Sequence, residues 1–289
     1  MAVSLGMRIP DAMRNLPIAE VAAFARDAGL DVLDLRADFA STAAACRAAG
    51  LGLGSVDGVV AGELISPDDA TRERAVADLC NQISSMAAAG ARTMFLCLVP
   101  RDDAQTIARS LELFKESFPA VARACEEAGV RIAFEGWPGP GPYYPTLGYT
   151  PEVWRAMFEA VPSASLGLCY DPSHLVRLGI PYLRVLDEFK GRIYHCHGKD
   201  TALLPEAQYL YGRFPPALDR TADFSGGAWR YCVPGSGIVD WSAVAYGLES
   251  AGYQGCVSIE LEDARYRGSV QSEQKGVRKA LSHLALHLR

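Results

Sequence analysis

The sequence predicts a single (β/α)8 barrel, the TIM barrel, and three observations lead to this fold class. Short apolar runs alternate with helix-like stretches eight times, which is typical of parallel βα units. The chain has 289 residues, 49% of them hydrophobic, which is enough for one large core and close to the roughly 250 residues of such a barrel. Ala-Gly pairs close several of the helix-like stretches. We therefore expect one domain over residues 1–289.

Eight apolar runs rich in branched residues are the expected strands. They cover residues 3–8, 31–36, 51–56, 92–99, 131–135, 165–171, 192–197 and 256–260. A glycine just past a helix adopts the left-handed conformation at little cost. The glycines expected at such helix ends are Gly29, Gly50, Gly90, Gly129 and Gly252. An open doubly wound sheet is the alternative, but no GxGxxG pattern follows the first run.

Two helices have recognisable starts. Ser66-Pro67 and Thr150-Pro151 each place an N-cap hydroxyl before a proline at the first helical position. After the second start, apolar residues recur at helical spacing, which indicates a face that packs on the core. These residues are Val153, Trp154, Met157, Phe158 and Val161.

Residues 201–240 form an unusually long connection between the seventh and eighth expected strands. The connection carries six aromatic residues, Tyr209, Tyr211, Phe214, Phe224, Trp229 and Tyr231. Loops of this length in a compact domain are usually lids or binding elements, whereas exposed aromatic residues also form subunit interfaces. The sequence leaves a lid and an interface equally open.

The charge balance, 28 Lys+Arg against 34 Asp+Glu, disfavours nucleic acid or an anionic membrane surface as a partner. No apolar run approaches the ~20 residues of a membrane helix, and MAVSLGMRIP has no signal-peptide pattern. We therefore expect a soluble, cytoplasmic protein. Its eight cysteines contain no CxxC pair and are expected to be free thiols.

The last residues of the fifth to eighth expected strands are all potential metal ligands, namely Glu135, Asp171, His197 and Glu260. The carboxyl ends of barrel strands meet at one mouth, where active sites lie. A single Glu there is usually a solvated strand end, but several buried charges would repel one another unless a cation joined them. Three carboxylates and one imidazole suit Mn²⁺, with Mg²⁺, Co²⁺ or Zn²⁺ as alternatives.

The stretch HCHGKD, residues 195–200, contains residues of alternating orientation. His195, His197 and Lys199 share one face of the strand and are expected to point into the barrel. Only His197 lies at the height of the mouth, so His195 is expected to be a hydrogen-bonded core residue or a support for a ligand. Lys199 points at the pocket or is a solvated lysine, and Asp200 is expected to hold the loop or neighbouring backbone.

Two further residues are candidates near the mouth. Trp137 lies in the loop WPGPGPYYP and either stacks on a sugar or packs over the barrel rim. Glu262 shares the orientation of Glu260 and competes with it as a ligand.

These motifs resemble those of the xylose-isomerase-like TIM barrels, which include sugar phosphate isomerases/epimerases and, as the nearest branch, the ketose 3-epimerases. The matching stretches are AFEGWP (133–138), YDPSHL (170–175), HCHGKD (195–200), PGSGIVDW (234–241) and SIELED (258–263). The resemblance covers essentially the whole chain. The resemblance implies that Glu135, Asp171, His197 and Glu260 bind one divalent metal ion and that His174 contacts substrate.

The resemblance implies a sugar isomerase or epimerase that acts on a keto-sugar or related polyol through an enediolate, with Glu135 and Glu260 as acid and base. The alternative is a lyase or dehydratase of a keto-sugar, 3-keto-glycoside or keto-inositol. An abasic-site endonuclease is disfavoured because no histidine precedes His174, and a non-catalytic sugar-binding barrel is disfavoured by the complete ligand set. The family also implies a homo-oligomer, a dimer or a tetramer, with a small sugar as ligand.

Overall fold

The protein is described by a computed structural model that covers residues 3–36, 39–141 and 143–289. Eight parallel strands close a barrel in the order β1, β2, β3, β4, β5, β6, β7 and β10, and β10 pairs with β1. Their bounds are β1 Ser4–Met7, β2 Val32–Leu35, β3 Gly52–Asp57, β4 Thr93–Leu96, β5 Arg131–Glu135, β6 Leu166–Tyr170, β7 Ile193–Gly198 and β10 Cys256–Ile259. Every strand overlaps an expected run, so the (β/α)8 prediction is confirmed.

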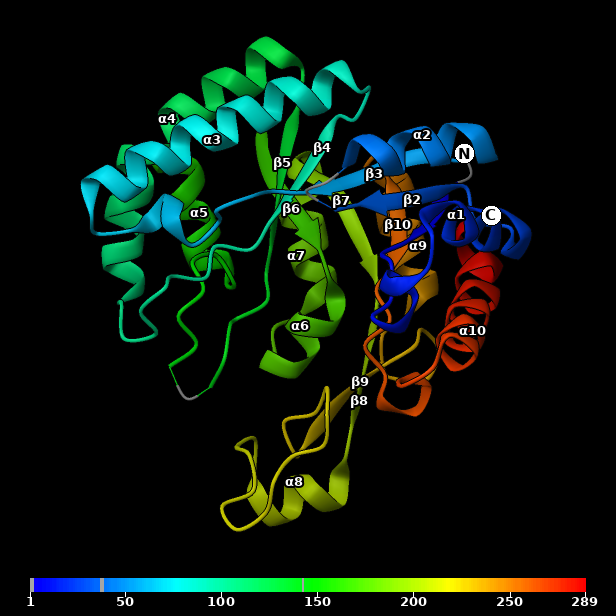
Figure 1. Ribbon diagram of the computed structural model, residues 1–289. Coiled ribbons are helices and arrows are strands. Elements are labelled where there is room, and N and C mark those ends of the chain that lie inside the picture. Colours follow the sequence, from blue (N-terminus) through cyan, green and yellow to red (C-terminus); the bar gives the residue numbers. More distant parts are fainter. Residues whose placement is uncertain (1–2, 37–38, 142) are drawn as a thin grey trace.

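Helices surround the barrel on its outer side (Figure 1). Their bounds are α1 Ile18–Ala28, α2 Phe39–Ala49, α3 Asp69–Ala88, α4 Ile107–Ala128, α5 Pro151–Ala160, α6 Pro172–Leu178, α7 Tyr182–Phe189, α9 Trp241–Ser250 and α10 Val270–Leu288. The backbone N–H of Val3 donates to the Leu288 carbonyl, which ties the end of α10 to β1. Within the described residues, no helix is both long and apolar enough to span a bilayer.

The expected helix ends are confirmed, since all five glycines of the Ala-Gly pairs have positive φ, between 63° and 89°. Thr150 is the N-cap of α5, with its side chain accepting from the Val153 N–H. The stripe on α5 faces the core as expected, with only Val153 less than fully buried.

The expected helix start at Ser66-Pro67 is wrong. The helix α3 begins two residues later, and its N-cap is Asp68, whose carboxylate accepts from the Thr71 N–H at 2.8 Å. The Ser66 hydroxyl accepts from the Asp68 N–H at 3.2 Å instead. Serine and aspartate are both good N-caps, and here Ser66 forms the turn that positions Asp68.

The long connection contains secondary structure of its own. It forms β8 Asp200–Leu203, α8 Pro205–Tyr211 and β9 Trp229–Cys232, and β8 pairs with β9 in an antiparallel two-stranded sheet. Figure 1 shows α8 and this sheet extending away from the barrel at the lower edge of the view.

Asp200 joins the two ends of the connection. Its carboxylate accepts hydrogen bonds of 2.8–3.2 Å from four backbone N–H groups, those of Thr201, Gly235, Gly237 and Val239. A Cβ at position 237 would lie 2.1 Å from Asp200 Oδ1, so this close approach requires glycine. The expected role of Asp200 in holding backbone is confirmed, and it accounts for part of the PGSG motif.

Candidate metal centre

Four side chains from four neighbouring strands meet at the carboxyl end of the barrel. Glu135 ends β5, Asp171 follows β6 and caps α6, His197 lies in β7, and Glu260 follows β10. The His197 Nδ1 atom lies 2.9 Å from Glu135 Oε2, 3.3 Å from Glu260 Oε2 and 3.8 Å from Asp171 Oδ2. The structure therefore brings together all four residues that the strand ends indicated.

Most of the converging atoms lack a hydrogen-bond partner. Among the described residues, both carboxylate oxygens of Glu135, Oδ2 of Asp171 and both ring nitrogens of His197 are buried and make no hydrogen bond, although several lie within ion-pair distance of one another or of Lys199. Buried polar atoms are rarely left in this state. Carboxylate oxygens and imidazole nitrogens are ligands of divalent cations, so these residues fit a metal ion.

The distances between donors agree with such a site. The ligand atoms of Asp171, His197 and Glu260 lie within 4.8 Å of one another, as do those of Glu135, Asp171 and His174. The Asp171 carboxylate is oriented through its other oxygen, which accepts from the Ser173 N–H at 2.8 Å.

Electrostatics keep the carboxyl groups ionised. Burial alone would raise the pKa of Glu135 and of Glu260, but the adjacent His197 holds the pKa of both below the usual range, and Lys199 further lowers that of Glu260. Burial opposes the charge of His197, yet Cys169, Glu260 and Glu135 raise its pKa well above the ordinary value. Both glutamates are therefore ionised at neutral pH.

Lys199 is buried beside these carboxylates, so the prediction that it is a solvated lysine is wrong. Its Nζ lies 2.5 Å from Glu260 Oε2, 2.9 Å from Glu262 Oε2 and 3.1 Å from Asp171 Oδ2. Burial would lower the pKa of this ammonium, but the three carboxylates raise it well above its ordinary value. Glu262 therefore pairs with Lys199, as the carboxylate of Glu260 does.

His174 joins the centre to the long connection. Its Nε2 lies 3.1 Å from Glu135 Oε1, and its Nδ1 lies 2.6 Å from the Tyr231 hydroxyl on β9. Arg177 donates to the same hydroxyl at 2.8 Å. The contribution of Tyr231 could not be assigned from the sequence, where it was one of six aromatic residues in the connection.

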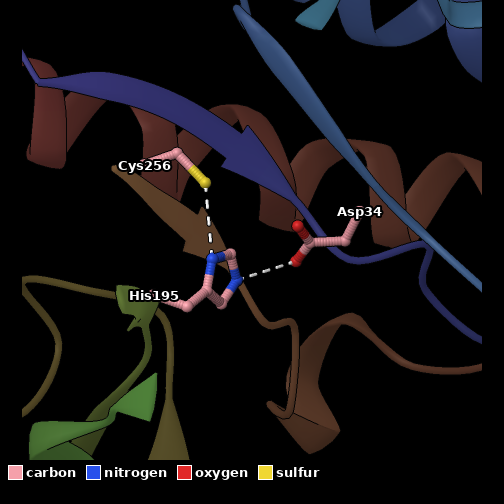
Figure 2. Close-up of side chains that lie close together, drawn as sticks. All are labelled: Asp34, His195 and Cys256. Carbon is pink, nitrogen blue, oxygen red and sulfur yellow. Dashed lines mark hydrogen bonds and ion pairs between the residues drawn. The ribbon is translucent and has the colours of Figure 1, made fainter. Parts of the chain in front are cut away.

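His195 lies below His197, with the two ring centroids 5.3 Å apart. Its Nε2 is 3.2 Å from Asp34 Oδ2 and its Nδ1 is 3.6 Å from Cys256 Sγ. Figure 2 shows the imidazole between its two partners, so that each ring nitrogen faces a different residue. The expected hydrogen-bonded core histidine is confirmed.

Two residues close to the centre were not identified as site residues from the sequence. Arg8 follows β1, and its Nε lies 3.3 Å from Glu260 Oε1 while its guanidinium stacks over Phe95 at 4.4 Å. Cys169 on β6 places its Sγ within 4.8 Å of ligand atoms of Glu135 and His197. Arg8 stands at a strand end, so a search of strand ends for cations would have found it.

Trp137 lies in the wall of a cavity of about 860 Å³ whose lining includes Tyr231 and Glu262. The cavity thereby adjoins the buried carboxylates through Lys199, which contacts Glu262 and lies 4.7 Å from the Tyr231 ring centroid.

The closed barrel and the buried carboxylates and imidazoles at its mouth define a TIM barrel with a centre suited to a divalent cation. The chain belongs to the xylose isomerase-like TIM barrel family, whose family model matches residues 10–287. The family inferred from the motifs is confirmed.

Relatives in this family include sugar-modifying enzymes. The chain is 32% identical over 136 residues to inosose dehydratase of Geobacillus thermodenitrificans (strain NG80-2), a match that covers 47% of this chain and 42% of that protein. A match to inosose dehydratase of Lacticaseibacillus casei is 27% identical and covers 47% and 42%. The chain thus spans less than half the length of these curated relatives.

Solved structures share the whole fold. D-psicose 3-epimerase, crystallised in the presence of D-fructose, has a TM-score of 0.74 at 15% identity and 99% coverage of both chains. The IOLI protein with a bound zinc atom has a TM-score of 0.74 at 16% identity, covering 98% of this chain and 99% of the other. At these identities the likeness establishes the fold alone.

Proposed function

We propose that the protein is a divalent-metal-dependent sugar isomerase or epimerase that exchanges a proton beside the carbonyl group of a keto-sugar or related polyol. The observation that carries the proposal is the set of buried atoms of Glu135, Asp171 and His197 that make no hydrogen bond and face Glu260. A divalent cation would satisfy these atoms and lower the cost of burying their carboxylates.

Glu135, Asp171, His197 and Glu260 hold the ion in this proposal, with Mn²⁺ as the first choice because most of the donors are oxygens. When bound, a divalent cation supplies positive charge beside the substrate oxygens, which stabilises the enediolate as the carbon-bound proton leaves.

The side chains move the proton. Glu135 and Glu260 lie on either side of His197 and are ionised, so that one removes the proton and the other returns it. His174 and Lys199 supply donors for the substrate oxygens, and Trp137 stacks on the substrate. Return of the proton to the same carbon gives epimerisation, whereas return to the neighbouring carbon gives isomerisation.

A lyase or dehydratase is the second candidate, because curated relatives of this chain are named inosose dehydratase. The first step is the same, since removal of the proton beside the carbonyl group also precedes loss of a hydroxyl or other group from the next carbon. The two candidates differ only in the product.

The experiment is incubation of a panel of keto-sugars and keto-inositols with the Mn²⁺-loaded protein in D₂O, followed by NMR. An epimerase or isomerase yields a deuterated sugar of changed configuration or carbonyl position, whereas a dehydratase yields a new carbon–carbon double bond. Glu260→Gln is expected to abolish deuterium incorporation, and Glu159→Gln, which alters an exposed residue of α5, is expected to retain it. Wild-type exchange in Glu260→Gln would refute the two-carboxylate mechanism.

A further inference from the structure

The cavity beside the candidate metal centre is larger than one sugar ring requires. Its volume is about 860 Å³, near the upper end of the ~300–1,000 Å³ of pockets that enclose drug-sized ligands. It lies between the loop after β5, which contributes Trp137 and Tyr144, and the long connection, which contributes most of the remaining lining. A monosaccharide held at the metal centre would leave most of this volume empty.

The walls of the cavity are rich in aromatic rings. Six rings line it, those of Trp137, Tyr144, Phe214, Phe224, Trp229 and Tyr231, together with three prolines. The rings of Trp229 and Tyr231 pack with their centroids 4.8 Å apart. Opposed walls of this composition favour a flat aromatic group, because aromatic rings gain both buried apolar area and ring–ring contact.

Two cations lie in the same walls. The Arg177 guanidinium stacks over the Trp229 ring at 4.2 Å, and Arg213 lines the cavity nearby. One N–H group of Arg177 already donates to the Tyr231 hydroxyl at 2.8 Å. The other N–H groups of the two arginines suit oxygen atoms at the edge of an aromatic ring.

The cavity adjoins the candidate metal centre through residues that contact both. Tyr231 lines it and also contacts His174, and Glu262 lines it and also pairs with Lys199. A ligand could therefore place a sugar at the carboxylates and an attached ring between the aromatic walls. We propose that the cavity is a subsite for an aromatic aglycone with oxygen substituents, so that the substrate is an aryl glycoside of an oxidised sugar. This proposal rests on the proposed function for the position of the sugar.

The experiment measures binding by calorimetry, with two unoxidised glycosides as probes that do not depend on turnover. 4-Nitrophenyl β-D-glucopyranoside is expected to bind the Mn²⁺-loaded protein at least ~10-fold more tightly than methyl β-D-glucopyranoside, because its aromatic ring is buried against the apolar walls. Trp229→Ala and, from the opposite wall, Trp137→Ala should each bring the two affinities close together. Tyr246→Ala, which removes a 73% exposed ring on α9, should leave the preference intact.

The outcomes separate this proposal from the proposed function. Equal binding of both probes by the wild-type protein, or an unchanged aryl preference in both tryptophan variants, would overturn the subsite even if keto-sugars exchange deuterium. An aryl preference that both tryptophan variants lose would support the subsite even if no keto-sugar on the panel exchanges.

Discussion

Asp34 holds a negative charge inside the barrel, below the residues that face the mouth. The side chain is 3% exposed and contacts the imidazole of His195 at 3.2 Å and the Ser55 N–H at 2.9 Å. Burial would raise the pKa of this carboxyl, but His195 and Arg8 lower it to about 2. The carboxylate is therefore retained as a fixed charge that orients the ring of His195 beneath His197.

The first prediction concerns this charge. Because the pKa of Asp34 is lower in the folded than in the unfolded protein, its ionised form stabilises the fold above about pH 4, and this contribution is lost as the pH falls towards 2. Asp34→Asn is expected to lower the free energy of unfolding by about 2 kcal/mol at pH 7 and by less at pH 3. Urea unfolding at both pH values measures the difference, with Asp27→Asn, whose carboxyl is 61% exposed, as the control. An equal loss of stability in Asp34→Asn at both pH values would contradict a stabilising charge on Asp34.

At the scale of elements, the Asp200 side chain joins the two ends of the long connection at its base. Asp200 accepts from N–H groups at both the beginning and the end of the segment, so that β8 and β9 leave the barrel and return to it at a defined place. The position of Tyr231 against His174 depends on this anchor, because both ends of the two-stranded sheet converge there.

The second prediction is that Asp200→Asn destabilises the protein by about 1–3 kcal/mol, since an amide nitrogen would replace one acceptor oxygen and leave two of the four N–H groups unpaired. Thermal unfolding measures this loss. Asp240→Asn is the matched control, because an asparagine oxygen can still accept from the Ala243 N–H and cap α9. Similar losses in both variants would show that the four-bond anchor has no special importance.

The sequence allowed the barrel elements to be predicted well, because helix-ending glycines and branched apolar runs are local signals. The strand ends also indicated which residues meet, since the geometry of a parallel barrel brings neighbouring carboxyl ends together. Contacts made by the connection could not be predicted. Tyr231 meets His174 across 57 positions of sequence, along a path that no short-range pattern specifies.

For the whole molecule, the metal ion is expected to contribute to stability, because it would bind the folded barrel and have no preformed site in the unfolded chain. The third prediction is that chelation lowers the melting temperature and that Mn²⁺ restores it. A free metal concentration of 100 times Kd would stabilise the folded protein by about 2.7 kcal/mol. Asp171→Asn should reduce the metal-dependent shift, whereas Asp27→Asn should preserve it. If none of Mn²⁺, Mg²⁺, Co²⁺ and Zn²⁺ changed the melting temperature, the proposed metal centre would be refuted.

The assembly of the chain into a dimer or a tetramer stays a prediction. Large apolar side chains are exposed in the connection, where Tyr209 is 86%, Leu210 64% and Leu218 97% exposed. Such residues are typical of an interface. Light scattering coupled to size-exclusion chromatography would give the mass of the assembly in solution.

The pairing of β1 with β10 joins residues 4–7 to residues 256–259. During synthesis at about 5–20 residues per second, the partner of β1 is made roughly 13–50 s after β1 itself. We expect β1 to lack its β10 partner throughout that interval, and the N–H and C=O groups of an unpaired strand edge are a template for pairing with other chains. Aggregation is therefore expected to compete with folding most strongly before β10 has been made and the barrel can close.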